Sequence, residues 1–307
     1  MTFPDLSDAF RLQRLQPPLG KARMVLDTDT YNEIDDQFAL VYALLSPQEL
    51  AVEAIYAAPF HNSRSDSPAD GMLKSYEEIL RLLDFLHIAA DGFVFRGADR
   101  YLGAGRAPVE SAAVRDLIDK ALASPDDDPL YVVAIGAITN VASALLLAPE
   151  IIGKIVVVWL GGHALHWRHS REFNLAQDVP AAQVLLDSGV PLVIVPCLGV
   201  SSHLLTSLPE LRASIGGRSA VGDYLCQIFA EYRPEGFAAS SVIWDISTIA
   251  WLINADWLPS ELRHSPVLTD QVTWSIDRSR HLVRVASFVQ RDPVFRDMFS
   301  KIRALGD

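Results

Sequence analysis

Four aspartates stand close together in the stretch DTDTYNEIDD: Asp27, Asp29, Asp35 and Asp36. The apolar residues 24–26 before them are typical of a buried strand, and residues 36–45 have the apolar period of a helix. We therefore expect the carboxylates on a loop at the carboxyl end of a strand, where open α/β sheets bind ligands. Negative charges this close repel one another in a crevice of low dielectric unless some are protonated or a cation binds them. Oxygen-only ligation favours calcium or magnesium over zinc.

A simpler reading of this loop is a helix start, with Asp35 and Asp36 acting as N-cap and favourable charge against the helix dipole. That reading accounts for one or two of the acids. Four acids favour a cation site.

The rest of the chain alternates apolar strands with amphipathic helices. Strands are predicted over 51–57, 130–135, 155–160 and 191–195, and helices over 72–86, 139–147 and 179–188. This rhythm predicts an α/β fold: an open, mainly parallel, Rossmann-like sheet with helices on both faces. Residues 1–22 read as an arm containing a short surface helix, and residues 23–307 as one domain. Within this domain, residues 200–247 look helical and loop-rich, and residues 271–275 with 282–288 look like a hairpin pair.

Composition restricts the partners. The 307 residues have a formal net charge of -12, so nucleic acid and anionic membrane surfaces are not expected to bind. No apolar stretch is long enough to span a bilayer, and the beginning of the chain has no apolar signal region, which predicts a cytoplasmic protein. Cys197 and Cys226 lie in apolar surroundings without CxxC spacing and are expected to be reduced core thiols.

Four later segments complete a pattern with the acidic loop: Phe60-His61-Asn62, AIGAITNVASAL, WLGGHALHWRHSREFNLAQDVPAAQVLL and SSVIWDISTIAWLI. Together they resemble the inosine-uridine-preferring nucleoside hydrolase family over residues 24 to about 255. The resemblance implies a calcium-dependent enzyme that hydrolyses the N-glycosidic bond of ribonucleosides to ribose and free base. It also implies a role in purine salvage and a homodimer or homotetramer.

The resemblance also assigns the metal ligands. Asp29, Asp36, Asp245 and the main-chain carbonyl of Thr139 would bind Ca²⁺, and Asn140 would cap the helix that follows. The acidic loop is two residues longer than is usual in the family, through the addition of Asn32 and Glu33.

Further residues are implied to hold the ribose: Asp35, Asn62, Glu172 and Asn174. If residues 172–174 are extended, Glu172 and Asn174 point the same way and Phe173 points into the core. Asp178 would cap the next helix.

Asp29 is the implied catalytic base, and Asp27 would orient the acidic loop. Trp244, directly before Asp245, stands where a purine-preferring branch of the family has a tryptophan that stacks on the base. His166 is a candidate for contact with the substrate.

Other histidines are candidates for the acid or for contact with the base: His61, His163 and His169.

Two other functions stay open. Asp27-Thr28-Asp29-Thr30 also matches the DxDxT motif of aspartyl-phosphate phosphatases, although no downstream lysine and acidic motif supports that chemistry. The longer acidic loop also allows a relative that binds calcium and ribose without turnover.

Overall fold

A mainly parallel sheet forms the centre of the protein, as the sequence predicts. The computed structural model describes residues 3–234 and 236–306. Within them, eight strands form one sheet in the order β3-β2-β1-β4-β5-β6-β12-β9. In chain order these strands are β1 (Ala22–Thr28), β2 (Leu50–Ala57), β3 (Val94–Arg96), β4 (Leu130–Ala134), β5 (Ile155–Leu160), β6 (Leu192–Val195), β9 (Ser260–His264) and β12 (Leu282–Ala286). Neighbouring strands are parallel except β12 and β9, which are antiparallel.

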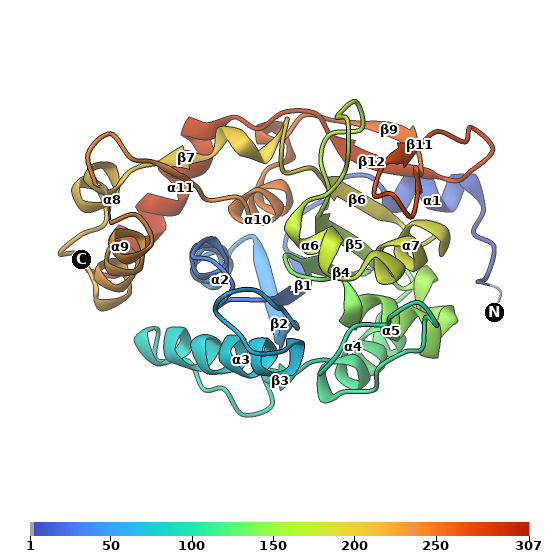
Figure 1. The fold of residues 1–307 in the computed structure, drawn as a ribbon, viewed down its shortest axis with the longest axis horizontal. Helices are drawn as coiled ribbons and strands as arrows, with labels where there is room; N and C mark the ends of the chain where they lie inside the picture. Colours follow the sequence, from blue (N-terminus) through green and yellow to red (C-terminus); the bar gives the residue numbers. More distant parts are fainter. Residues whose placement is uncertain (1–2, 235, 307) are drawn as a thin grey trace.

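Helices cover both faces of the sheet, because both faces of its central strands are apolar. On β1, Met24 and Leu26 belong to one core and Val25 to the other, as the alternation of side chains along a strand requires. Figure 1 shows the sheet between the two helical layers. The first layer contains α2 (Asp35–Leu44), α3 (Pro68–Phe85), α8 (Leu208–Ser214), α9 (Ala220–Tyr232), α10 (Ile246–Ile253) and α11 (Arg291–Arg303). The second contains α4 (Ala112–Ala123), α5 (Thr139–Leu147), the 3-10 helix η1 (Pro149–Gly153) and α7 (Val179–Asp187).

The predicted helices and strands lie close to the observed ones. The largest difference is α3, which begins at Pro68 rather than at Met72 because the Ser67 side chain accepts a hydrogen bond from the Asp70 N–H and caps the helix there. The alternative reading of the acidic loop as a helix start is correct in part: Asp35 and Asp36 lie in the first turn of α2, but Ile34 occupies the N-cap position.

The predicted pairing of residues 271–275 with 282–288 is also wrong. The short strand β11 (Trp274–Ser275) pairs instead with β10 (Val267–Leu268), while β12 enters the main sheet beside β6 and β9. A local apolar pattern marks a strand but does not select its partner, and β6 is distant in the sequence.

Further short elements are α6 (Phe173–Gln177), η2 (Ser201–His203), η3 (Ala255–Trp257) and the antiparallel pair β7 (Leu205–Thr206) and β8 (Ser241–Val242). Cys197 and Cys226 are free and buried, which confirms that prediction.

The N-terminal arm packs on the domain through α1 (Asp8–Arg14), whose Arg11 and Arg14 are buried. The Arg11 guanidinium donates to the Gly189 carbonyl, and that of Arg284 in β12 donates to the Leu15 carbonyl. The helix of the arm is therefore partly buried, not purely a surface helix as predicted.

Candidate active site

The carboxyl ends of the parallel strands enclose a cavity of about 300 Å³. Asp29 follows β1, Ile135 follows β4, Leu160 ends β5 and Cys197 follows β6, and all four line this cavity. Ligands of open α/β sheets bind at this edge, so the cavity is the candidate active site.

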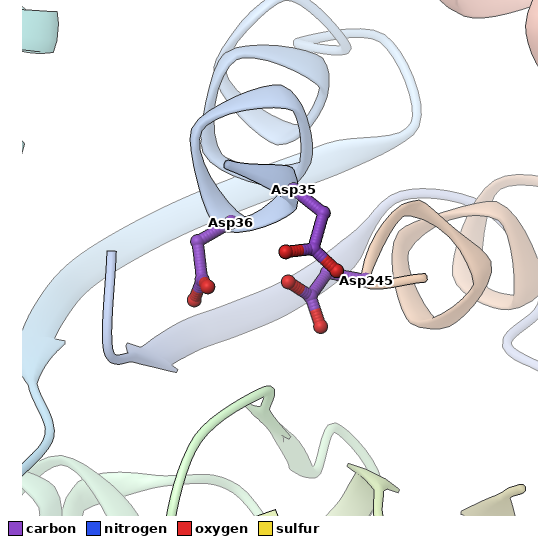
Figure 2. A group of neighbouring side chains, drawn as sticks. All are labelled: Asp35, Asp36 and Asp245. Carbon is purple, nitrogen blue, oxygen red and sulfur yellow. The ribbon is translucent and has the colours of Figure 1, made fainter. Parts of the chain in front are cut away.

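Three carboxylates converge in the cavity from two helices. Asp35 and Asp36 extend from the first turn of α2, and Asp245 precedes α10 (Figure 2). One oxygen from each lies within 4.8 Å of the others, and all three residues are buried. The Thr28 hydroxyl donates to Asp36, and the Trp244 N–H donates to Asp35 at 3.2 Å. The structure thus brings together the predicted ligands Asp36 and Asp245, and it adds Asp35 to them.

Asp29 follows β1 and lies beside these carboxylates. It is fully buried, and neither of its carboxylate oxygens has a hydrogen-bond partner among the described residues. Burial, and then the charges of Asp36 and Asp35, raise the pKa of Asp29 well above its ordinary value. The pKa of Asp245 rises well above its ordinary value for the same reasons.

These oxygens fit a cation. Two unpartnered buried oxygens on Asp29, beside three clustered carboxylates, are costly unless protons or a positive charge compensate them. All the donors are oxygens, which suits a hard divalent ion. Thr139, the other predicted ligand, begins α5 and is fully buried, and its hydroxyl donates to Asp178 at 2.7 Å.

Glu172 and Asn174 line the cavity, but through a helix and not an extended segment. The Glu172 carboxylate is the N-cap of α6 and accepts from the N–H groups of Asn174 (2.8 Å), Gly162 (2.9 Å) and Leu175 (3.1 Å). The Asn174 amide donates to the carbonyls of Ile135 and Leu160, both at 3.1 Å. The prediction that Phe173 points into the core is wrong: it is half-buried and lines the cavity, because the cap turns the chain into a helix.

Asn62 does not line the cavity. Its amide donates at 2.6 Å to the side-chain oxygen of Asn32, a buried residue that does line it. Asn32 and Glu33, which the sequence analysis interprets as an addition to the acidic loop, both line the cavity. The contact between two loops that brings Asn32 into the cavity wall has no local signal in the sequence.

The histidines separate into two environments. His163 is buried and lines the cavity, and burial lowers its pKa, with a smaller effect from His169. His166 is exposed and lines a different cavity of about 490 Å³ beside Trp274, so the structure does not bring it to the candidate site. His61 and His169 are exposed.

Trp244 is half-buried and lines the cavity next to Asp245, as the motif predicts. Arg171 also lines it and is a residue that the sequence pattern does not single out.

A layer of polar residues supports the acidic loop from beneath. Asp27 is fully buried, does not line the cavity and accepts from the Asn140 amide at 2.7 Å. The predicted helix-capping role of Asn140 is wrong, because this side chain instead joins Asp27 to the Ala57 carbonyl and the Ala98 N–H. Asp178 caps α7 by accepting from the Ala181 N–H, as predicted.

Comparison with known proteins agrees with this geometry. Residues 24–296 match the family described as inosine-uridine preferring nucleoside hydrolase. The chain belongs to this nucleoside hydrolase family. It is therefore an N-ribosyl hydrolase, and the resemblance seen in the sequence is confirmed.

Relatives named for different specificities resemble this nucleoside hydrolase. The pyrimidine-specific ribonucleoside hydrolase RihA of Salmonella arizonae is 31% identical over 261 residues, covering 76% of this chain and 80% of that protein. The non-specific ribonucleoside hydrolase RihC of Salmonella paratyphi B is 29% identical over 255 residues, covering 76% and 79%. The fold resembles that of a purine-preferring ribonucleoside hydrolase from Gardnerella vaginalis, with a TM-score of 0.75 and 20% identity over 92% of this chain and 99% of that one.

In the part of the chain that the structure describes, no helix combines the length and apolarity needed to span a membrane.

Proposed function

We propose that this nucleoside hydrolase cleaves ribonucleosides with the help of calcium and prefers purine bases. The observation that carries the proposal is the meeting of three features in one cavity: the unpartnered Asp29, the carboxylates of Asp35, Asp36 and Asp245, and the aromatic Trp244.

The proposed calcium ligands are Asp29, Asp36, Asp245 and the Thr139 carbonyl. Calcium bound there would bind the ribose 2′ and 3′ hydroxyls and lower the pKa of the attacking water. No described residue hydrogen-bonds to either Asp29 oxygen, so one oxygen stays available to accept the proton of that water.

The ribose is held by side chains whose own positions are fixed. The Asn174 amide is bound to two carbonyls of neighbouring strand ends, which leaves its oxygen to face a sugar hydroxyl. Asp35 is held by the Trp244 N–H, and Glu172 by three backbone N–H groups. Asn62 acts indirectly by positioning Asn32. Groups fixed in this way favour the oxocarbenium-like ring without reorganising during the reaction.

The purine preference rests on Trp244. A stacked indole stabilises a large aromatic base, and it raises the basicity of a ring nitrogen that must gain a proton on departure. Among the described histidines only His163 lines the cavity, so it is the histidine placed to contact the base.

A phosphatase function fits the geometry poorly. The first aspartate of the DxDxT motif would be the nucleophile, but Asp27 lies outside the cavity and is bound to Asn140. A relative that only binds ribose would show calcium and ribose binding without turnover.

The direct test is to incubate the calcium-loaded protein with inosine, adenosine and uridine and to measure free ribose with a reducing-sugar assay. Release of ribose, fastest from the purine nucleosides, is expected. Binding of ribose without release from any of the three would contradict catalysis. A role in cytoplasmic purine salvage and assembly into a homodimer or homotetramer stay predictions.

A further inference from the structure

One residue of the acidic loop lines the catalytic cavity without being an acid. Five residues of this loop line the cavity, and four of them carry carboxylates: Asp29, Glu33, Asp35 and Asp36. An ionised carboxylate only accepts hydrogen bonds. The fifth residue, Asn32, is 7% exposed, and its side chain has both an acceptor oxygen and a donor nitrogen. The orientation of this amide therefore decides whether the loop offers a donor to a ligand.

A series of hydrogen bonds fixes the orientation of the Asn32 amide. The Arg64 main-chain N–H, which can only donate, donates to the Asn62 side-chain oxygen at 2.8 Å. The Asn62 amide nitrogen therefore lies on the other side, where it donates to the Asn32 side-chain oxygen at 2.6 Å and to the Asn32 main-chain carbonyl at 3.4 Å. A main-chain carbonyl can only accept, so both ends of the series require the same orientation of Asn62.

The amide nitrogen of Asn32 is consequently left to the cavity. The side-chain oxygen is bound to Asn62, and within residues 3–234 and 236–306 no group accepts a hydrogen bond from the nitrogen. A largely buried N–H group without a protein partner gains from an acceptor oxygen on a ligand.

The segment that carries Asn32 is held in place. The Asn32 main-chain N–H donates to the Asp29 carbonyl at 2.7 Å. The Arg64 guanidinium donates to the Glu33 carbonyl at 3.0 Å and lies over the Tyr31 ring, 4.2 Å from its centre. A donor fixed in this way loses little conformational entropy when a ligand binds.

We propose that the Asn32 amide donates a hydrogen bond to a ribose hydroxyl of the substrate, and that Asn62, as a positioning residue, sets the direction of this bond. This inference rests on the proposed function, in which the ribose lies against the calcium ligands and Asp35. Asn32 lies between Asp29 and Asp35 in the loop, on the same side of the site. A hydroxyl both donates and accepts. It gives its proton to a carboxylate while its oxygen accepts from Asn32, an arrangement that the carboxylates of the loop alone do not allow.

Asn62→Asp tests this by reversing the series with the change of one heavy atom. The carboxylate still accepts from the Arg64 N–H, but the atom that faces Asn32 becomes an acceptor, so the Asn32 amide turns over and its oxygen faces the cavity. Ribose affinity of the calcium-loaded protein, measured by calorimetry, should fall about three- to tenfold. KM for inosine should rise by a similar factor while kcat stays within about twofold. The melting temperature should stay within about 4 °C of wild type, because a hydrogen bond between residues 32 and 62 is kept.

The matched control is Asn254→Asp. The Asn254 side chain also accepts from a main-chain N–H, that of Asp256, at 3.0 Å, and it does not line the cavity. The same chemical change at this position should leave ribose affinity and the melting temperature unchanged.

A second variant identifies the hydroxyl. Asn32→Ala should lose the same ribose affinity, and adding Asn62→Asp to it should bring no further loss, because Asn62 acts through Asn32. Inosine is then compared with its 2′-deoxy, 3′-deoxy and 5′-deoxy analogues by release of the base. On the analogue that lacks the contacted hydroxyl, Asn32→Ala should lose no kcat/KM. Equal losses on inosine and all three analogues would overturn the inference.

The outcomes separate this inference from the proposed function. Hydrolysis of inosine together with unchanged ribose affinity in Asn62→Asp would overturn the inference and leave the proposed function standing. Loss of ribose affinity in the variant, without hydrolysis by the wild-type protein, would reject turnover alone. A wild-type protein that neither binds ribose nor hydrolyses inosine would reject both.

Discussion

Asp27 and Asp29 show how two neighbouring aspartates acquire different roles. Both lie at the carboxyl end of β1 and are fully buried. Asp27 accepts the Asn140 amide beneath the cavity, whereas Asp29 lines the cavity and has no partner among the described residues. The first is therefore a structural acid, and the second is the one placed to act on a ligand.

Asp29→Asn is predicted to lose turnover far more than affinity. The amide keeps an oxygen that can coordinate a cation, but it does not accept the proton of the attacking water. General-base catalysis contributes on the order of 10²–10⁴-fold, so kcat should fall by about that factor. Ribose affinity, measured by calorimetry, should change much less. The control is Asp66→Asn, an exposed acid. Wild-type turnover by Asp29→Asn would remove it as the base.

Trp244→Ala is predicted to separate activation of the leaving base from pocket shape. Loss of stacking should slow inosine or guanosine hydrolysis by roughly fivefold to a few hundredfold. A p-nitrophenyl riboside, which has a good leaving group, should slow much less. The hydrogen bond to Asp35 comes from the main-chain N–H of Trp244 and survives the substitution.

Trp244→Phe is the matched control, because it keeps a stacking ring. Equal slowing of both substrates in Trp244→Ala would mean that the indole shapes the pocket and does not activate the base.

At the scale of elements, the site depends on where α2 begins. The helix starts at Asp35 directly above the end of β1, so its first turn presents Asp35 and Asp36 to the cavity. The positive end of the helix dipole favours these charges. Asn62 and Asn32 then join the loop before α2 to the loop after β2.

Asn140→Ala is predicted to destabilise the fold beneath the acidic loop. The Asn140 side chain donates a hydrogen bond to Asp27 at the end of β1 and accepts one from the Ala98 N–H after β3. Its removal leaves buried polar groups unsatisfied, at a cost of about 2–4 kcal/mol in the free energy of unfolding. Urea denaturation measures this change. Asn254→Ala, which removes an exposed hydrogen bond to Asp256, should cost under about 1 kcal/mol. Similar losses of unfolding free energy in both variants would show that the Asn140 hydrogen bonds stabilise the fold no more than an exposed hydrogen bond does.

For the whole molecule, the central sheet was predictable because residues 24–26, 155–160 and 191–195 are apolar on both faces, and acids at a strand end mark a ligand site. Three errors concern contacts between distant segments. No local pattern brings β12 beside β6, or the Asn62 side chain to Asn32. The role of Asn140 depends in the same way on a tertiary neighbour, Asp27. The Phe173 error is local, because the Glu172 side chain caps α6 through the N–H groups of Asn174 and Leu175 and turns the segment into a helix.

The buried acids predict an unusual pH dependence of stability. In the calcium-free protein, burial above all raises the pKa of Asp27 and of Asp36 from 3.8 to about 7. At pH values between these two pKa values, the folded state therefore binds more protons than the unfolded state. The resulting stabilisation is complete below about pH 4 and is lost as the pH rises through about 7.

After chelation, the melting temperature should accordingly fall between about pH 5 and about pH 8. Calcium should restore it, and the gain should be larger at about pH 8, where the carboxylates are ionised and bind the ion. The free energy of unfolding should rise by about 2.7 kcal/mol when free calcium is a hundredfold above its Kd. Asp245→Ala should lose the calcium gain, whereas Asp66→Asn should keep it. A chelated protein whose stability rises with pH, or whose melting temperature does not respond to calcium, would contradict both the metal assignment and the charge repulsion from which it follows.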